Sequence, residues 1–278
     1  MLKSIFKSWS YIVWFVFHLF LFGMLTGGLI MPVYIIFFLV AFMPVSEKLW
    51  RWSIGIRPLR LKAERDRLIP LFDEVYSAYR HEEMVKHTEN IKLYIQESMS
   101  INAFAFGRET LVLTKGVVDL LSDEDIKGLI AHELAHFHHY DTMGALFTYV
   151  ANFPMSLLMK KLRQIDSTLG DGIAKFFFNI IFGFFRLIEF VGELILMSHS
   201  RKQEYVADMS ALKWGYGEEL AGMLIHLYQL SMEKPKSIRE MIKMTHPPIT
   251  KRIEQLEYWI YLVDNLAYVP EGIDIYPR

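Results

Sequence analysis

The sequence contains no cysteine, which excludes disulfide bonds and thiolate metal ligands. Any metal ion must therefore be held by histidine, aspartate or glutamate side chains. The formal net charge is −1, so the chain has no excess of positive charge for a nucleic-acid surface. We expect no nucleic-acid partner, and any binding site has to be found in local groups of residues.

Charge is also absent from one long stretch near the N-terminus. No Lys, Arg, Asp or Glu occurs from Ser8 to Ser46, where Phe, Ile, Leu, Val and Trp dominate. About 20 apolar residues in a helix cross the core of a bilayer, so the stretch fits two crossings. With a break at Thr26-Gly27-Gly28, the sequence predicts a transmembrane hairpin of helices at 9–25 and 29–45. The alternative is a buried helical hairpin in a soluble protein.

Basic residues flank the uncharged stretch on both sides. Lys3 and Lys7 precede it, and a group of Lys and Arg residues between 48 and 67 follows it. Positive charge marks the cytoplasmic side of membrane helices, so both ends of the hairpin are expected in the cytoplasm.

The spacing of apolar residues changes several times after the hairpin. Residues 62–87 have apolar side chains three and four apart, which predicts an amphipathic helix, and Pro70 suits its start. Alternation of apolar and polar residues then predicts three strands, at 91–97, 101–106 and 110–114. Ser122 precedes three acidic residues and predicts the N-cap of a helix that ends near Tyr140.

Two further apolar stretches lie at 142–159 and 173–198. The second contains four charged residues that are costly in lipid, which are Lys175, Arg186, Glu189 and Glu193. The sequence leaves open whether this pair spans a membrane. The remainder predicts helices at 201–214, 218–231 and 248–263.

The helix that starts at Ser122 carries His132-Glu133-Leu134-Ala135-His136, an H-E-x-x-H pattern. Residues four apart lie on the same helix face, so His132 and His136 can bind one Zn²⁺. Glu133 projects from nearly the same side and can accept a proton from water. The alternative is a chance pattern with two solvated histidines, but the capped helix start and the small or apolar neighbours favour a metal site.

Zinc hydrolases usually bind the ion through three protein ligands. Glu204 is the best candidate for the third ligand, because Asp208 lies one helical turn later and can support a ligand by a hydrogen bond. Glu189 and Glu193 are competing candidates.

Three more residues near the H-E-x-x-H pattern can carry supporting roles. Asp141 lies five residues after His136 and can orient a ligand imidazole. His138 and His139 point in other directions around the helix, so we expect them at the surface or behind the ligands.

Four motifs in a fixed order resemble a known family. They are Asn102-Ala103-Phe104-Ala105-Phe106-Gly107, the H-E-x-x-H at 132, Ser200-Arg201-Lys202-Gln203-Glu204 with Ala207-Asp208, and His246-Pro247-Pro248 with Arg252. Over roughly residues 60–260 the chain resembles the HtpX-like and CAAX-prenyl-protease class of membrane zinc metallopeptidases, which are gluzincins. The resemblance implies an α+β, mostly helical fold: a zincin-type catalytic domain with a small antiparallel sheet, plus the N-terminal transmembrane hairpin.

The resemblance also implies roles for single residues. It implies one Zn²⁺ per chain, held by His132, His136 and Glu204, with Glu133 as the general base. The other roles implied are an oxyanion donor at His246, a charge partner at Arg252, and an edge strand for substrate binding at Asn102, Ala103, Phe104 and Ala105. From the residues alone, an ordinary short strand is the simpler interpretation of this last segment.

The expected organisation has two parts. Residues 1–60 form the hairpin and a basic linker, and residues 61–278 form the metallopeptidase domain with an inserted hydrophobic helical pair at 142–198. The chain lacks the additional spans of the CAAX prenyl proteases, which argues against prenylated substrates. Phe106 stands where the family often has a smaller polar residue, which leaves the substrate preference open.

Together these features predict a membrane-anchored zinc endopeptidase that acts on peptides or membrane proteins, in quality control or processing. The expected location is a bacterial-type inner (cytoplasmic) membrane, with the bilayer as a partner and the catalytic domain on the cytoplasmic side. Two alternatives are a catalytically inactive metal-binding membrane scaffold and a membrane structural protein with an accidental motif.

Overall fold

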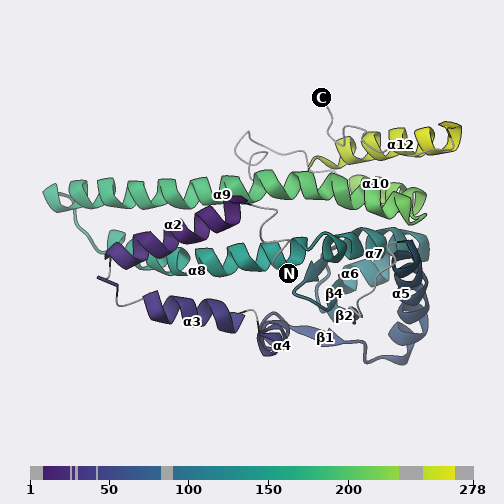
Figure 1. Ribbon diagram of the computed structural model, residues 1–278, viewed down its shortest axis with the longest axis horizontal. Coiled ribbons are helices and arrows are strands. Elements are labelled where there is room, and N and C mark those ends of the chain that lie inside the picture. The colour runs from purple at the N-terminus through teal and green to yellow at the C-terminus, as the bar shows by residue number, and fades with distance from the viewer. Residues whose placement is uncertain are drawn as a thin grey trace. The chain divides into compact units, whose positions relative to one another are not determined.

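The computed structural model describes residues 9–25, 27–28, 31–41, 43–82, 90–231 and 247–266 (Figure 1). The chain divides into two compact units. The first comprises Met1–Glu47 and Gly144–Ser198, and the second comprises Lys48–Met143 and His199–Arg278.

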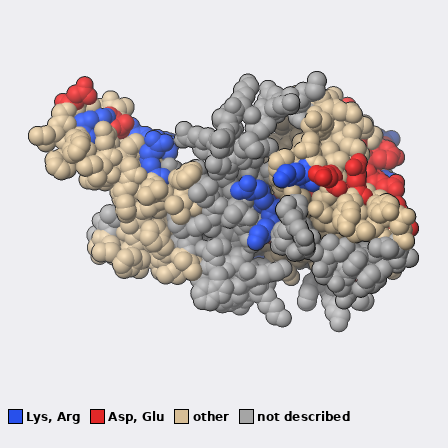
Figure 2. Space-filling view, turned by 90° about the horizontal axis from the view of Figure 1, so that it is seen from above, with Lys and Arg blue, Asp and Glu red and all other residues tan. Residues whose placement is uncertain are grey.

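Helices build the described part of the first unit. It contains α2 (Trp9–Leu25), α3 (Met31–Ala41), most of α8 (Asp141–Asp166) and the first part of α9 (Ile173–Lys213). Among its described side chains, a buried apolar cluster contains Phe22, Met155, Met159, Phe185 and Ile188. On the face shown in Figure 2, charged side chains gather at one end of this unit, where α8 and α9 are joined.

The helix bounds predicted at 9–25 and 29–45 agree with the structure for the first helix and differ for the second. The second helix ends at Ala41, and a separate helix, α4 (Pro44–Ser53), follows it. Proline suits the first turn of a helix because its missing N–H needs no partner there, which explains the new start at Pro44. Within the described residues, none of the helices is both long and apolar enough to span a membrane.

A four-stranded sheet lies in the second unit, in the order β1-β2-β4-β3. Its strands are β1 (Ile56–Pro58), β2 (Lys92–Gln96), β3 (Ala103–Phe106) and β4 (Thr110–Thr114). The prediction of a purely antiparallel sheet was wrong, because β2 and β4 are parallel. The chain passes from β2 to the outer edge before it forms β3, and β3 returns to β4 through a tight turn in which Gly107 has φ +63°.

Helix α5 (Lys62–Glu82) begins eight residues before Pro70, so the predicted start at this proline was wrong. Glu64 fixes the real start, because its Oε2 accepts a hydrogen bond from the N–H of Leu61 at 3.3 Å. Buried apolar residues on both sides of Pro70, among them Leu68 and Leu71, hold the helix across the proline. Residues 83–89 of the predicted helix lie outside the described residues.

Helix α7 (Asp123–His138) begins as the sequence predicted, after a short helix α6 (Lys115–Leu120). The Ser122 side chain accepts a hydrogen bond from the N–H of Asp125, whose carboxylate accepts one from the N–H of Ser122. The chain leaves α7 through Tyr140, which has φ +61°. The reciprocal hydrogen bonds between Ser122 and Asp125 fix the register of α7, which is almost entirely buried.

The helices after α7 complete the core of the second unit. Helix α9 continues without a break from Ile173 to Lys213, so the prediction of a separate helix at 201–214 was wrong. Its apolar first part and its amphipathic last part differ in composition, but no helix-breaking residue separates them. Helices α10 (Gly217–Ser231) and α12 (Ile249–Leu266) follow. One continuous core joins α5, α7, α10, α12, the sheet and the last turns of α9.

Candidate metal centre

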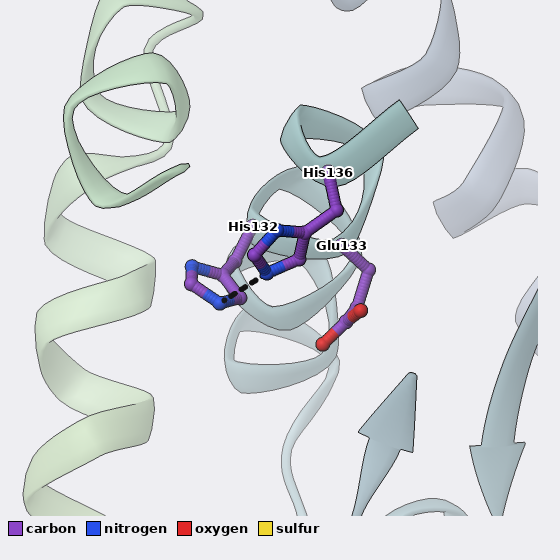
Figure 3. Close-up of side chains that lie close together, drawn as sticks. All are labelled: His132, Glu133 and His136. Atoms are coloured by element: carbon purple, nitrogen blue, oxygen red, sulfur yellow. Dashed lines mark hydrogen bonds between the residues drawn. The ribbon is translucent and has the colours of Figure 1, made fainter. Parts of the chain in front are cut away.

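Helix α7 brings His132, Glu133 and His136 together in the core of the second unit (Figure 3). His132 is 3% exposed and Glu133 is 7% exposed. The two Nε2 atoms of His132 and His136 lie 3.3 Å apart, and their rings stand nearly perpendicular. Each of the three residues offers one ligand atom within 4.8 Å of the others. The helical spacing therefore places two imidazoles around a common point.

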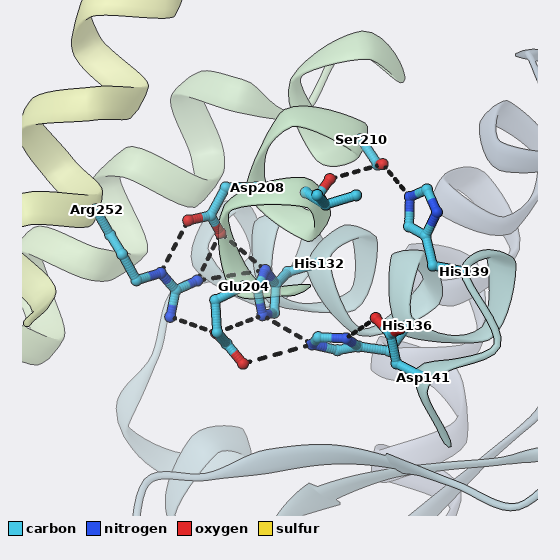
Figure 4. Close-up of polar contacts among 9 residues, drawn as sticks. His132, His136, His139, Asp141, Glu204, Asp208, Ser210 and Arg252 are labelled. Carbon is cyan, nitrogen blue, oxygen red and sulfur yellow. Dashed lines mark hydrogen bonds and ion pairs between the residues drawn. The ribbon is translucent and has the colours of Figure 1, made fainter. Parts of the chain in front are cut away.

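Glu204 reaches the same point from helix α9 (Figure 4). Its Oε2 lies 3.4 Å from His132 Nε2, and its Oε1 lies 3.8 Å from His136 Nε2. A tetrahedral zinc ion with bonds of about 2.0–2.2 Å holds its ligand atoms roughly 3.3–3.6 Å apart. Two imidazoles and one carboxylate at these distances fit a zinc ion in both donor chemistry and spacing.

Each imidazole is held from behind by a carboxylate. His132 Nδ1 lies 2.9 Å from Asp208 Oδ1, and His136 Nδ1 lies 3.1 Å from Asp141 Oδ2. Donation from Nδ1 leaves the lone pair on Nε2, which faces the common point. The side-chain amide of Gln203 in turn donates to Asp141 Oδ1. These contacts fix the tautomer and the direction of both rings.

Arg252 of α12 balances the negative charge of this buried group. Its guanidinium donates to both oxygens of Asp208, at 2.9 and 2.6 Å, and its Nη1 lies 3.0 Å from Glu204 Oε2. Arg252 Nη2 also lies 3.3 Å from His132 Nδ1, but an Nδ1 that donates to Asp208 cannot accept from Arg252. Arg252 is 6% exposed, so its pairing with these two carboxylates offsets a large desolvation cost.

The pKa values of the group reflect this competition between burial and charge. Burial and Arg252 lower the pKa of His132, but the hydrogen bonds with Asp208 and Glu204, together with the negative charge of Asp208, raise it to about 9. Burial lowers the pKa of His136, but the hydrogen bond with Asp141 and the negative charges of Glu133 and Glu204 together raise it above its ordinary value. Burial raises the pKa of Asp208, but Arg252 and His132 hold it below its ordinary value. Metal ligation requires neutral imidazoles, so a cation competes with protons here.

Comparison with known proteins identifies the family of this chain. A model of Peptidase family M48 matches residues 73–260, more than half of the chain. The chain belongs to peptidase family M48. The matched segment includes every residue of the buried group, from His132 to Arg252.

Individual relatives agree with this assignment. A Protease HtpX homolog of Dictyoglomus turgidum is 30% identical over 200 residues, which cover 59% of this chain and 62% of that protein. A Protease HtpX homolog of Streptococcus uberis is 28% identical over 217 residues, which cover 63% of this chain and 69% of that protein. The chain thus spans about 62% of the first relative's length.

A solved structure supports the fold. The crystal structure of S. mikatae Ste24p matches with a TM-score of 0.52 and 18% sequence identity, covering 80% of this chain and 55% of that one. Together with the matching family, this supports the α+β, mostly helical interpretation, with the sheet now known to be mixed.

The predicted substrate-binding residues of this M48 chain lie at one edge of the sheet. Ala103, Phe104 and Ala105 lie in β3, at an outer edge of the sheet, and Asn102 is exposed just before that strand. His246 lies outside the described residues, and so do the side chains of Glu189 and Glu193.

His138 and His139 point away from the common point. The His138 ring packs edge-on against Tyr79 and Trp214, and His139 Nε2 lies 2.9 Å from Ser210 Oγ. Gln203 is a contact that sequence reasoning missed. It stands inside the quoted motif next to Glu204, but only the fold shows that its amide reaches Asp141.

Proposed function

We propose that this chain is a membrane-anchored, zinc-dependent endopeptidase that hydrolyses peptide bonds. The observation that carries the proposal is the convergence of His132 Nε2, His136 Nε2 and the Glu204 carboxylate, with separations of 3.3, 3.4 and 3.8 Å. Membership of family M48 supports a peptide or protein as the substrate.

In this proposal His132, His136 and Glu204 hold one Zn²⁺. When bound, the ion acts as a Lewis acid that polarises the scissile carbonyl and makes water more acidic. Glu133 acts as the general base: it accepts a proton from the attacking water and delivers it to the leaving amine. It is suited to this role because it neighbours His132 on α7 and lies within the same donor group.

The surrounding charges position these groups rather than react. Asp208 and Asp141 orient the two imidazoles at 2.9 and 3.1 Å. Arg252 neutralises Asp208 and lies 3.0 Å from Glu204 Oε2, which fixes the Glu204 carboxylate beside the two imidazoles. His246 is proposed as a hydrogen-bond donor to the oxyanion that forms at the scissile carbonyl.

The proposed substrate site is the edge strand β3 with the preceding Asn102. Among the described strands, β3 pairs with β4 alone, so its other edge can accept a peptide as an added strand. Thr142 supports this strand from the side of the metal centre, because its Oγ1 donates to the carbonyl of Gly107 at 2.8 Å. Gly107 begins the turn between β3 and β4, and Thr142 follows Asp141 directly.

The proposed location is a bacterial-type inner membrane, with the metal centre on the cytoplasmic side. The uncharged stretch from Ser8 to Ser46 and the basic residues around it support the anchor and its orientation. Exposed large apolar side chains on α9, including Phe176, Ile180 and Phe184, support lipid contact by the first unit. A role in quality control or processing of membrane proteins follows from this placement.

A paired measurement of zinc content and proteolysis tests the proposed activity. Full-length wild-type protein in detergent should bind one zinc ion per chain and cleave casein, and a chelator should abolish cleavage. Glu133→Gln should keep the zinc and lose cleavage, because the variant retains the ligands and lacks the base. A wild-type protein that binds zinc without cleaving any substrate would instead indicate a metal-binding scaffold. Full cleavage by Glu133→Gln would refute the assignment of the base.

A further inference from the structure

Helix α4 (Pro44–Ser53) is amphipathic in the opposite sense to an ordinary surface helix. Its buried side carries the polar residues Ser46, Glu47 and Arg51. Its exposed side carries three large apolar residues, Val45, Leu49 and Trp52. Positions spaced by four and three residues share one helix face, so these three form a continuous stripe. Trp52 is 83% exposed, whereas Arg51 beside it in sequence is 8% exposed.

The polar side of α4 is fixed to the sheet of the second unit. Arg51 Nη1 donates to Thr110 Oγ1 at 2.6 Å and lies 3.7 Å from Glu109 Oε1. The guanidinium also stands 4.7 Å from the centre of the Tyr94 ring. Rotation of the helix to bury Leu49 and Trp52 would break these contacts. The buried charge of Arg51 would then lose its partners, which is costly. The apolar stripe is therefore held facing outward.

An apolar outer face indicates an apolar or interfacial surrounding. Helices that face water bury their apolar side, and α4 does the reverse. The helix begins at Pro44, inside the uncharged stretch that ends at Ser46, and Lys48 is its first basic residue. Tryptophan and lysine are typical of the headgroup region, where a ring can lie among acyl chains while the charge stays in water. The neighbouring sequence thus favours lipid over a protein partner.

We propose that α4 is an interfacial helix, with Leu49 and Trp52 inserted into the headgroup region of the bilayer. Because Arg51 joins α4 to β2 and β4, insertion of Leu49 and Trp52 holds these strands at the membrane surface. The second unit then binds the bilayer through α4 in addition to the hairpin. The inference rests on the proposed membrane anchor and adds a separate docking surface to it.

The absence of cysteine in the sequence permits a direct test by site-specific labelling. Full-length protein with a single cysteine at Trp52, Leu49, Val16 or Tyr261 is labelled with an environment-sensitive fluorophore and reconstituted in vesicles of phosphatidylcholine and phosphatidylglycerol. Quenching is measured with headgroup-labelled and acyl-labelled nitroxide lipids and with aqueous iodide. Val16 on α2 reports the proposed anchor, and Tyr261 on α12 is the control for an exposed site of the second unit.

The control at Tyr261 is matched to the α4 sites in exposure and apolar character. Tyr261 is 62% exposed and Leu49 is 61% exposed, and Figure 1 shows α12 on the opposite side of the second unit from α4. We expect headgroup nitroxides to quench the labels at Leu49→Cys and Trp52→Cys, with protection from iodide. The label at Tyr261→Cys should show the reverse pattern.

Three results would overturn the proposal, and they have different meanings. If the Val16→Cys label is quenched by lipid while the α4 labels stay open to iodide, the anchor stands and the interfacial helix is wrong. If α4 labels are protected from iodide without lipid quenching, another protein surface covers the stripe, and lipid docking is again wrong. If the Val16→Cys label also escapes lipid quenching, the proposed membrane anchor itself fails.

Discussion

The side-chain amide of Gln203 donates to one oxygen of Asp141, while the other oxygen of Asp141 lies 3.1 Å from His136 Nδ1. Gln203 is the residue before Glu204, so one turn of α9 contacts the candidate metal centre in two ways. Glu204 approaches both imidazoles directly, and Gln203 approaches one of them through a carboxylate.

This relationship predicts that Gln203→Leu weakens metal binding without unfolding the protein. Without the amide, Asp141 can turn away from His136, and partners behind metal-binding histidines are worth about 10- to 100-fold in metal affinity. We expect a loss of about tenfold for this variant, because Asp141 itself remains. Zinc affinity is measured by competition with a chromophoric chelator, and folding by thermal denaturation of the metal-loaded protein.

Ser210→Ala is the matched control for Gln203→Leu. Ser210 also lies on α9 and also joins it to the end of α7, through His139 Nε2 at 2.9 Å, but this contact does not reach His132 or His136. The control should retain the wild-type zinc affinity. Equal losses in the two variants would show that docking of α9, and not the orientation of Asp141, sets the affinity.

A second prediction concerns Arg252, which holds two buried carboxylates. In Arg252→Met, Asp208 and Glu204 both lose their guanidinium partner, and breaking a buried ion pair costs about 3–5 kcal/mol. We expect a loss of that size in the free energy of unfolding by urea. Lys251→Met, at the exposed neighbouring position on α12, should change it by less than about 0.5 kcal/mol.

The H-E-x-x-H pair and the capped start of α7 could be predicted because both depend on residues close in sequence. Ser122 caps its own helix, and His132 and His136 share a face through helical periodicity alone. The approach of Glu204 is different, since it joins α9 to α7 across the fold. The sequence suggested Glu204 by its place in a motif, and no local pattern contains the 3.4 Å separation from His132.

The errors in the predicted fold have the same physical origin. The order of strands is set by contacts between distant residues, so local alternation predicted β2, β3 and β4 and left their order unknown. The three residues of β1 are too few to show alternation, and β1 is held in place by pairing with β2. The helix start assigned to Pro70 ignored the earlier cap at Glu64 and the burial of residues around the proline.

A third prediction concerns the acid sensitivity of the contact between β1 and α5. Arg57 Nη2 lies 2.7 Å from Glu64 Oε1. Burial raises the pKa of Glu64, but the hydrogen bond from Arg57 has a larger effect and lowers this pKa below its ordinary 4.5. A carboxyl whose pKa is lower in the folded state stabilises the fold above its unfolded pKa and loses that contribution as pH falls through the folded pKa. Stability should therefore decline below about pH 4.5 in part through this group.

Glu64→Gln tests this assignment by removing the titrating group. Because Arg57 keeps its second partner Glu97, we expect a loss of about 1 kcal/mol at pH 7, which shrinks as the pH falls below 4.5. The difference between the urea unfolding curves of variant and wild type is measured at pH 7 and at acidic pH. A difference that stays constant over this range would show that charge on Glu64 is not responsible.

The last prediction uses two glycines on the packed helices α7 and α10. A Cβ added at Gly128 of α7 would lie 2.4 Å from the backbone N of Leu220 in α10, which is far inside van der Waals contact. At Gly222 of α10 the nearest atom to an added Cβ would be Asp125 Oδ1, at an ordinary 3.9 Å. Alanine favours a helix over glycine by about 1 kcal/mol, so the space around the added Cβ decides the sign of each substitution.

Gly222→Ala should stabilise the fold by up to about 1 kcal/mol, whereas Gly128→Ala should destabilise it by about 1–3 kcal/mol because the two backbones must separate. Urea unfolding measures both, and a Gly128→Ala variant as stable as wild type would show that α7 and α10 do not pack this closely.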